Sequence, residues 1–104
     1  MENQLKEKLV IREATKKDVP LILSLIKELA VYEKLLHEVV ATEDQLTEIL
    51  FGQKKYAEVL IAIYDNENAG FALFFHNFST FLGKPGIYLE DLYVKPQLRG
   101  KGIG

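Results

Sequence analysis

Apolar side chains recur along the chain at two spacings, one typical of helices and one typical of strands. Between residues 19 and 36 they return every three or four positions, which predicts an amphipathic helix. Thr15 and Asp18 precede this run as a helix start, and Pro20 is tolerated in its first turn. The stripe that we expect to face the core consists of Val19, Ile22, Leu25, Ile26, Leu29, Tyr32 and Leu36.

A second, shorter helix is predicted from the capping box that Thr42 and Gln45 form. Leu46, Ile49 and Leu50 would face inward, and Gly52 would end the helix.

Four segments are strand-like, at residues 9–12, 56–64, 69–78 and 86–94. The near-continuous apolar run at 59–63 indicates a strand buried on both faces. A polar turn at 65–68 predicts a hairpin between the second and third strands, and residues 79–85 form a loop. The phenylalanines of this half are expected mostly in the core or as loop anchors: Phe71, Phe74, Phe75, Phe78 and Phe81.

The predicted order is therefore β-α-α-β-β-β, followed by a glycine-rich turn. This order supports an α/β (α+β) fold with a mixed, mostly antiparallel central sheet and flanking helices. No repeat, linker or low-complexity stretch divides residues 1–104, so we expect a single domain.

Composition and charge exclude several classes of function. The 104 residues carry a formal net charge of −2 with no cluster of Lys or Arg, which leaves nucleic-acid binding without an electrostatic footprint. The chain has no cysteine, so disulfides and thiol catalysis are excluded. A polar start and the lack of a long apolar run predict a cytoplasmic protein without a membrane segment.

A glycine-rich turn follows directly on the last predicted strand. Gly100, Gly102 and Gly104 allow successive backbone N–H groups to point the same way, which is the chemistry of a phosphate cradle. A Walker loop is a poor fit because no hydroxyl residue follows Lys101, and a dinucleotide fingerprint would open the fold rather than follow several strands. The remaining alternative is a tight turn that binds nothing.

Two adjacent carboxylates, Glu90 and Asp91, interrupt the last apolar strand. A carboxylate in such a strand is costly unless it is paired or functional. Neighbours on a regular strand face opposite sides, but a bulge could turn both toward one cleft. We favour Glu90 as substrate anchor and general base, with Asp91 second; ordinary paired carboxylates are the alternative.

The two histidines, His37 and His76, have no metal-ligand spacing with other candidates, so no metal site is expected.

The run Gln97-Leu98-Arg99-Gly100-Lys101-Gly102 resembles the acetyl-CoA signature of the GCN5-related N-acetyltransferase (GNAT) family: Arg or Gln, two residues, Gly, one residue, Gly or Ala. Residues 11–18 resemble a typical opening of that family. Residues 26–33 and 88–94 look like its diamine/polyamine branch, the spermidine/spermine- and thialysine-type acetyltransferases. The resemblance spans the first part of the family domain, a truncated GNAT-like fold.

The resemblance implies transfer of an acetyl group from acetyl-CoA to a primary amine. Backbone amides of the turn would hold the pyrophosphate, the end of the strand would pair with the pantetheine arm, and an N–H there could stabilise the oxyanion. Arg99 and Lys101 either add charge or are merely solvated. The implied cofactor residues are Leu92, Tyr93, Val94, Arg99, Gly100, Lys101, Gly102, Ile103 and Gly104.

The resemblance also implies that Tyr32 and Glu33 contact the amine substrate, together with Glu90 and Asp91. Several carboxylates would suit a dication. Without the resemblance, Tyr32 reads as a core residue and Glu33 as a solvated one.

Two other functions stay open: acetylation of a protein or peptide amine, and a non-catalytic CoA-binding or interaction module. The resemblance places the general acid of the reaction beyond residue 104, so the domain is expected to be incomplete at its C-terminus. An open sheet edge would then favour self-association, and we expect a homodimer.

Overall fold

The computed structural model describes residues 8–100 and 102–104 and has four strands in one antiparallel sheet, in the order β1-β2-β3-β4. The strands are β1 (Leu9–Glu13), β2 (Glu58–Tyr64), β3 (Glu67–Ser79) and β4 (Lys84–Val94). Two α-helices, α2 (Val19–Tyr32) and α3 (Glu43–Phe51), join β1 to β2, and short 3-10 turns lie at η1 (Lys16–Asp18), η2 (Leu36–Glu38) and η3 (Pro96–Leu98). The α/β fold class and the order of elements are as predicted.

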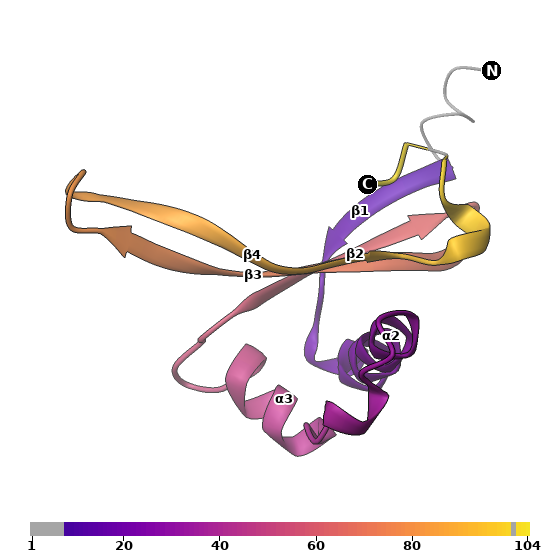
Figure 1. The fold of residues 1–104 in the computed structure, drawn as a ribbon, viewed down its shortest axis with the longest axis horizontal. Coiled ribbons are helices and arrows are strands. Elements are labelled where there is room, and N and C mark those ends of the chain that lie inside the picture. Colours follow the sequence, from indigo (N-terminus) through magenta and orange to yellow (C-terminus); the bar gives the residue numbers. More distant parts are fainter. Residues whose placement is uncertain (1–7, 101) are drawn as a thin grey trace.

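Both helices cover the same face of the sheet (Figure 1). Between them and the sheet lies the main core, in which Ile22, Leu25 and Ile61 are fully buried. The other core members are Val19, Leu23, Leu46, Leu50, Val59, Phe71 and Tyr93. A smaller cluster joins Ala62 and Ala69 to Leu98 of η3, so the segment after β4 is anchored to the sheet.

An ion pair fixes the start of α2 against β1. Arg12 donates two hydrogen bonds to Asp18, of 2.7 and 2.9 Å, and the backbone N–H of Thr15 donates a third to the same carboxylate. Arg12 thereby holds the pKa of Asp18 well below its usual range. The predicted helix start at Thr15 becomes the turn η1, and Pro20 lies in the first turn of α2.

The first helix is shorter than the hydrophobic spacing predicts. It ends at Tyr32, and Lys34 then takes a left-handed backbone with φ of 62°. The expectation that Tyr32 and Leu36 face the core is wrong, since they are 61% and 47% exposed. The reason is that the helix ends at Tyr32, so the helical spacing of apolar residues beyond it no longer places them on the helix face that packs on the core.

The turn between β2 and β3 is tighter than predicted. Asp65 and Asn66 both have positive φ, 51° and 66°, as a two-residue hairpin turn requires.

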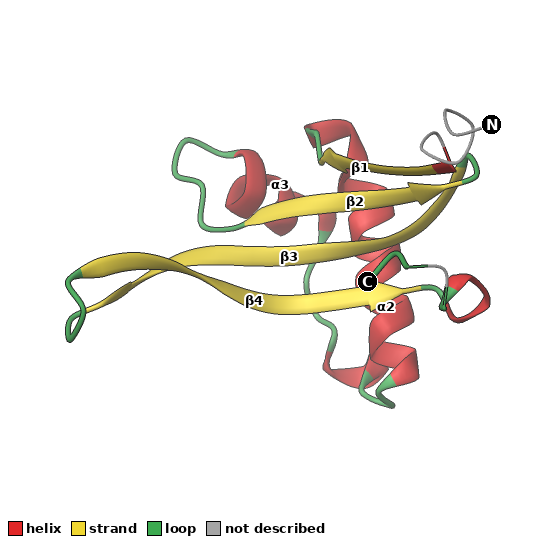
Figure 2. Cartoon of the chain, turned by 90° about the horizontal axis from the view of Figure 1, so that it is seen from above, coloured by secondary structure: helices red, strands yellow, loops and turns green. Residues whose placement is uncertain are grey.

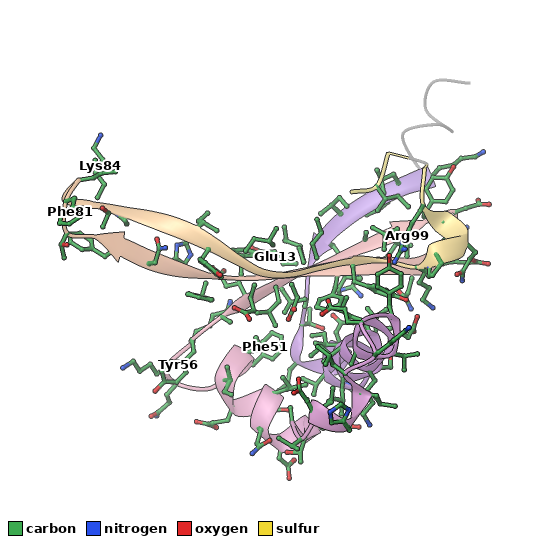
Figure 3. All side chains as sticks on the ribbon, in the orientation of Figure 1. Glu13, Phe51, Tyr56, Phe81, Lys84 and Arg99 are labelled. Atoms are coloured by element: carbon green, nitrogen blue, oxygen red, sulfur yellow. The ribbon has the colours of Figure 1, made fainter. Side chains whose placement is uncertain are left out.

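The hairpin of β3 and β4 continues far beyond the helices (Figure 2). Its tip carries Phe81, which is fully exposed, and Phe78, which is 63% exposed. The prediction that these two phenylalanines lie in the core or anchor the loop is wrong, because no helix of the described residues lies beneath this end of the hairpin (Figure 3). Phe71, by contrast, is buried in the core.

Candidate active site

The glycine-rich turn and the end of β4 border a cavity of about 320 Å³. Gly100 and Gly102 have φ of 81° and 78°, a backbone that favours glycine, and a Cβ at either would meet nothing within 4 Å. The turn is therefore open enough for a ligand to reach its backbone. The cavity is lined by Tyr32, Leu92, Val94, Leu98, Arg99, Gly100, Gly102, Ile103 and Gly104.

Most of the residues predicted to hold the cofactor thus lie around one cavity. Two need separate mention. Lys101 lies outside the described residues, and the side chain of Tyr93 points away from the cavity into the core, where 5% of it is exposed.

One edge of β4 is free for pairing along the cavity. Val94, Tyr93 and Leu92 pair with β3 on one side, and among the described residues no strand follows on the other. An extended ligand arm can therefore accept and donate backbone hydrogen bonds there, as the predicted pantetheine contact requires.

The hydroxyl of Tyr93 donates a hydrogen bond of 3.2 Å to Oε1 of Glu28 on α2. Burial and the nearby Glu28 charge raise the pKa of Tyr93. Oε2 of Glu28 lies 3.8 Å from Nζ of Lys95, so Glu28 ties the strand end to the helix. Sequence analysis did not single out Glu28, because its contacts join segments that are distant in the chain.

The strand β4 has a bulge at the predicted carboxylates. Leu73 of β3 pairs with Asp91 while the next residue, Phe74, pairs with Leu89, so Glu90 has no partner in the register. This irregularity breaks the alternation of faces and lets Glu90 and Asp91 line the same cavity.

That cavity, of about 380 Å³, lies between the bulge and the end of α2. Glu33 and Glu38 also line it, so four acidic residues lie in its wall, and the other lining residues are apolar: Ile26, Leu29, Ala30, Leu35 and Val39. Burial and the charges of Glu90 and Glu33 raise the pKa of Asp91. Sequence analysis missed Glu38, because this residue follows the predicted helix and nothing in the sequence indicates what it contacts. In the structure, the turn η2 brings Glu38 to the cavity.

Tyr32 belongs to the first cavity and Glu33 to the second, so the end of α2 stands between them. The guanidinium of Arg99 lies 4.5 Å from the centre of the Tyr32 ring. The four residues predicted to meet the amine are therefore divided: three surround the acidic pocket, and Tyr32 faces the glycine-rich turn.

The histidines lie apart from both cavities. His76 pairs through Nε2 with Glu58 at 2.8 Å, and His37 lies on η2. Within residues 8–100 and 102–104, no group of three metal-ligating side chains is close enough to hold an ion. No helix of this part of the chain is both long and apolar enough to cross a membrane.

The sequence profile of the Acetyltransferase (GNAT) family matches residues 24–104, and the chain belongs to this family. The match includes α2 from Ser24 onward, the bulge of β4 and the glycine-rich turn.

Among individual relatives, the chain is 43% identical to thialysine N-epsilon-acetyltransferase of Bos taurus, over 91% of this chain and 60% of that protein. It is 31% identical to L-ornithine N5-acetyltransferase of Arabidopsis thaliana, over 90% of this chain and 61% of that protein. The chain thus spans about 60% of the length of these relatives.

Solved structures support the fold. An aminoglycoside acetyltransferase from an uncultured soil sample, solved with sisomicin, has a TM-score of 0.77 at 21% identity and covers 96% of this chain and 64% of its own. An integron cassette protein from a salt-marsh metagenome has a TM-score of 0.74 at 24% identity, covering 100% of this chain and 67% of its own.

Proposed function

We propose that this protein transfers an acetyl group from acetyl-CoA to a primary amine of a small diamine- or polyamine-like substrate. The observation that carries the proposal is the adjacency of two cavities, one on a glycine-rich turn and one with four acidic residues in its lining. Membership of the GNAT family, whose cosubstrate is acetyl-CoA, supports it, as do relatives that are named for amine substrates.

The glycine-rich turn fits the proposed cosubstrate. The left-handed Gly100 and Gly102, and Gly104 after them, have open space beside them, so the backbone of the turn can approach a pyrophosphate. Arg99 and Ile103 line the same cavity. The free edge of β4 at Leu92 and Val94 can pair with an extended arm. Bound acetyl-CoA would supply the thioester as the acetyl donor.

The acidic pocket would bind the amine and take its proton. A primary amine is protonated near neutral pH and must lose a proton before it attacks a carbonyl carbon. Glu90 and Asp91, side by side at the bulge, are the candidate bases. Asp91 is half-buried with a raised pKa, which makes it the better proton acceptor of the two, while the exposed Glu90 suits an anchor for the ammonium group. This assignment reverses the order that the sequence favoured.

The number of carboxylates favours a dication over a simple amine. Glu33 and Glu38 remain available for a second ammonium when Glu90 and Asp91 engage the reacting one. This favours a diamine, a polyamine or a free lysine-like amino acid over an amine whose other end is uncharged.

A panel of acceptors tests the proposal through release of free thiol from acetyl-CoA. We expect a short diamine, spermidine and thialysine to react about tenfold faster at low concentration than a monoamine of equal length. Glu33→Gln should narrow that gap, whereas Glu43→Gln, an exposed residue of α3, should leave it unchanged. Equal rates for monoamine and diamine, or reaction only with a lysine peptide, would contradict a dication site.

We further propose that the protein forms a homodimer and acts in the cytoplasm. The support for the dimer is the exposed apolar surface of the hairpin that β3 and β4 form.

A further inference from the structure

The side chain of Arg99 is engaged on three sides by the protein itself. Its Nε donates a hydrogen bond of 2.8 Å to the carbonyl of Val94, the last residue of β4. Its guanidinium lies 4.5 Å from the ring centre of Tyr32 and 5.7 Å from that of Tyr93. Figure 3 shows Arg99 beside the end of the sheet, on the side toward α2.

These contacts use what distinguishes arginine from lysine. A planar guanidinium can stack on an aromatic ring and hydrogen-bond at its edge at the same time, whereas an ammonium is a compact point charge. The geometry therefore requires arginine for its shape, and not only for its charge.

Arg99 lies between a segment anchored to the sheet and the glycine-rich turn. Leu98 before it is 9% exposed and packs on the sheet, and Gly100 after it takes a left-handed φ of 81°. The contact with Tyr32 is therefore made by the residue that directly precedes the glycines.

The other end of the stack leads to the acidic pocket. Tyr32 is the last residue of α2, and Glu33, which follows it directly, lines the pocket of carboxylates. Tyr32 and Glu33 thus join the two cavities through consecutive residues at the end of α2.

We propose that Arg99 is a positioning residue that fastens the glycine-rich turn to the end of α2 by stacking on Tyr32, so that the two cavities keep a fixed spacing. The stack itself follows from the contacts above; its effect on ligand binding rests on the proposed function, in which the turn holds the CoA pyrophosphate.

The stack can be tested in the free chain by NMR. Tyr32→Leu should shift the amide signals of Gly100 and Gly102 and speed the solvent exchange of the Arg99 Nε proton. The matched control is Tyr56→Leu, because Lys54 lies 5.3 Å from the Tyr56 ring and this ring is 58% exposed, against 61% for Tyr32. Unchanged glycine signals in Tyr32→Leu would overturn the proposal.

The effect on the ligand is tested by titrating coenzyme A into the wild type, Arg99→Lys, Tyr32→Leu and the double variant. Each single change should weaken binding about two- to fivefold, the effect of an exposed cation–π contact, and the double variant should lose no more than the larger single change. Wild-type affinity in Arg99→Lys would show that only the charge of residue 99 matters, and would overturn the proposal. Losses that multiply in the double variant would show that Arg99 and Tyr32 act independently, and would overturn it as well. Failure of the wild type to bind coenzyme A would instead contradict the proposed function, and the NMR comparison would still decide on the stack.

Discussion

The surroundings of Asp91, in the acidic pocket, oppose the charge of its carboxylate. Its pKa is raised first by burial and then by the charges of Glu90 and Glu33. An acid with a folded-state pKa above its unfolded value lowers the stability of the fold when it is ionised. That loss is present above the folded-state pKa and disappears as the pH falls below the unfolded value, about 3.9.

Replacing Asp91 should therefore stabilise the protein while it removes function. We predict that Asp91→Asn raises the melting temperature by a few degrees at about pH 7 and that the gain vanishes near about pH 3. Thermal denaturation followed by circular dichroism across this range measures it. The exposed neighbour provides the control, Glu90→Gln, with a smaller gain. A lower melting temperature for Asp91→Asn at neutral pH would show that its carboxylate is structural.

At the scale of elements, the end of β4 lies unusually close to β3. Gly70 pairs with Val94, and a Cβ at Gly70 would collide with the carbonyl of Tyr93. Glycine is therefore required here by the close approach of the two backbones. This close contact between Gly70 and the end of β4 also determines where the free edge of β4 and the start of the glycine-rich turn lie.

We predict that Gly70→Ala lowers the free energy of unfolding by about 1–3 kcal/mol, the range for overpacking, and also weakens coenzyme A binding. Gly86→Ala on the same hairpin is the matched control, because its Cβ would meet only the side-chain end of Asn77, which can move. Urea denaturation and calorimetric titration of both variants compare them. Equal losses in the two would mean that the close contact at Tyr93 has no special role.

The elements also show how far the sequence could be used. Glycine and capping-box chemistry act locally, so the turn at Gly100 and the start of α3 at Thr42 were predictable. The sequence left a regular strand and a bulge at Glu90 both open. The alternation of side chains along one strand does not show the register of that strand with its partner.

Contacts between distant segments of the chain could not be predicted from the sequence. The left-handed Lys34 ends α2 in spite of a helical apolar period that continues to Leu36. The stack of Arg99 on Tyr32 likewise joins residues far apart in the chain, so it gave no local signal.

Viewed as a whole, the molecule has a compact end, where the helices cover the sheet, and a bare hairpin that projects from it (Figure 1). The hairpin exposes apolar side chains, including Phe78, Phe81, Leu82 and Ile87. Such a surface favours association with another chain.

We predict that the protein self-associates through this hairpin and that the double variant Phe81→Ser, Ile87→Thr shifts it toward the monomer. Sedimentation equilibrium at several concentrations measures the change. Val40→Thr, at a residue 82% exposed between η2 and α3, serves as the control and should leave the assembly unchanged. A monomeric wild type, or dissociation by the control alone, would rule out the hairpin as the interface.

In the proposed reaction, the acidic bulge acts on an amine while the glycine-rich turn holds the acetyl donor. The most direct measurement is diamine-dependent release of free thiol from acetyl-CoA by the wild type and by the double variant Glu90→Gln, Asp91→Asn, with coenzyme A affinity determined in parallel. We expect thiol release by the wild type, a rate about 100-fold or more lower in the variant, and nearly equal affinities of the two for coenzyme A. Bound coenzyme A without diamine-dependent release by the wild type, or release undiminished in the variant, would contradict it.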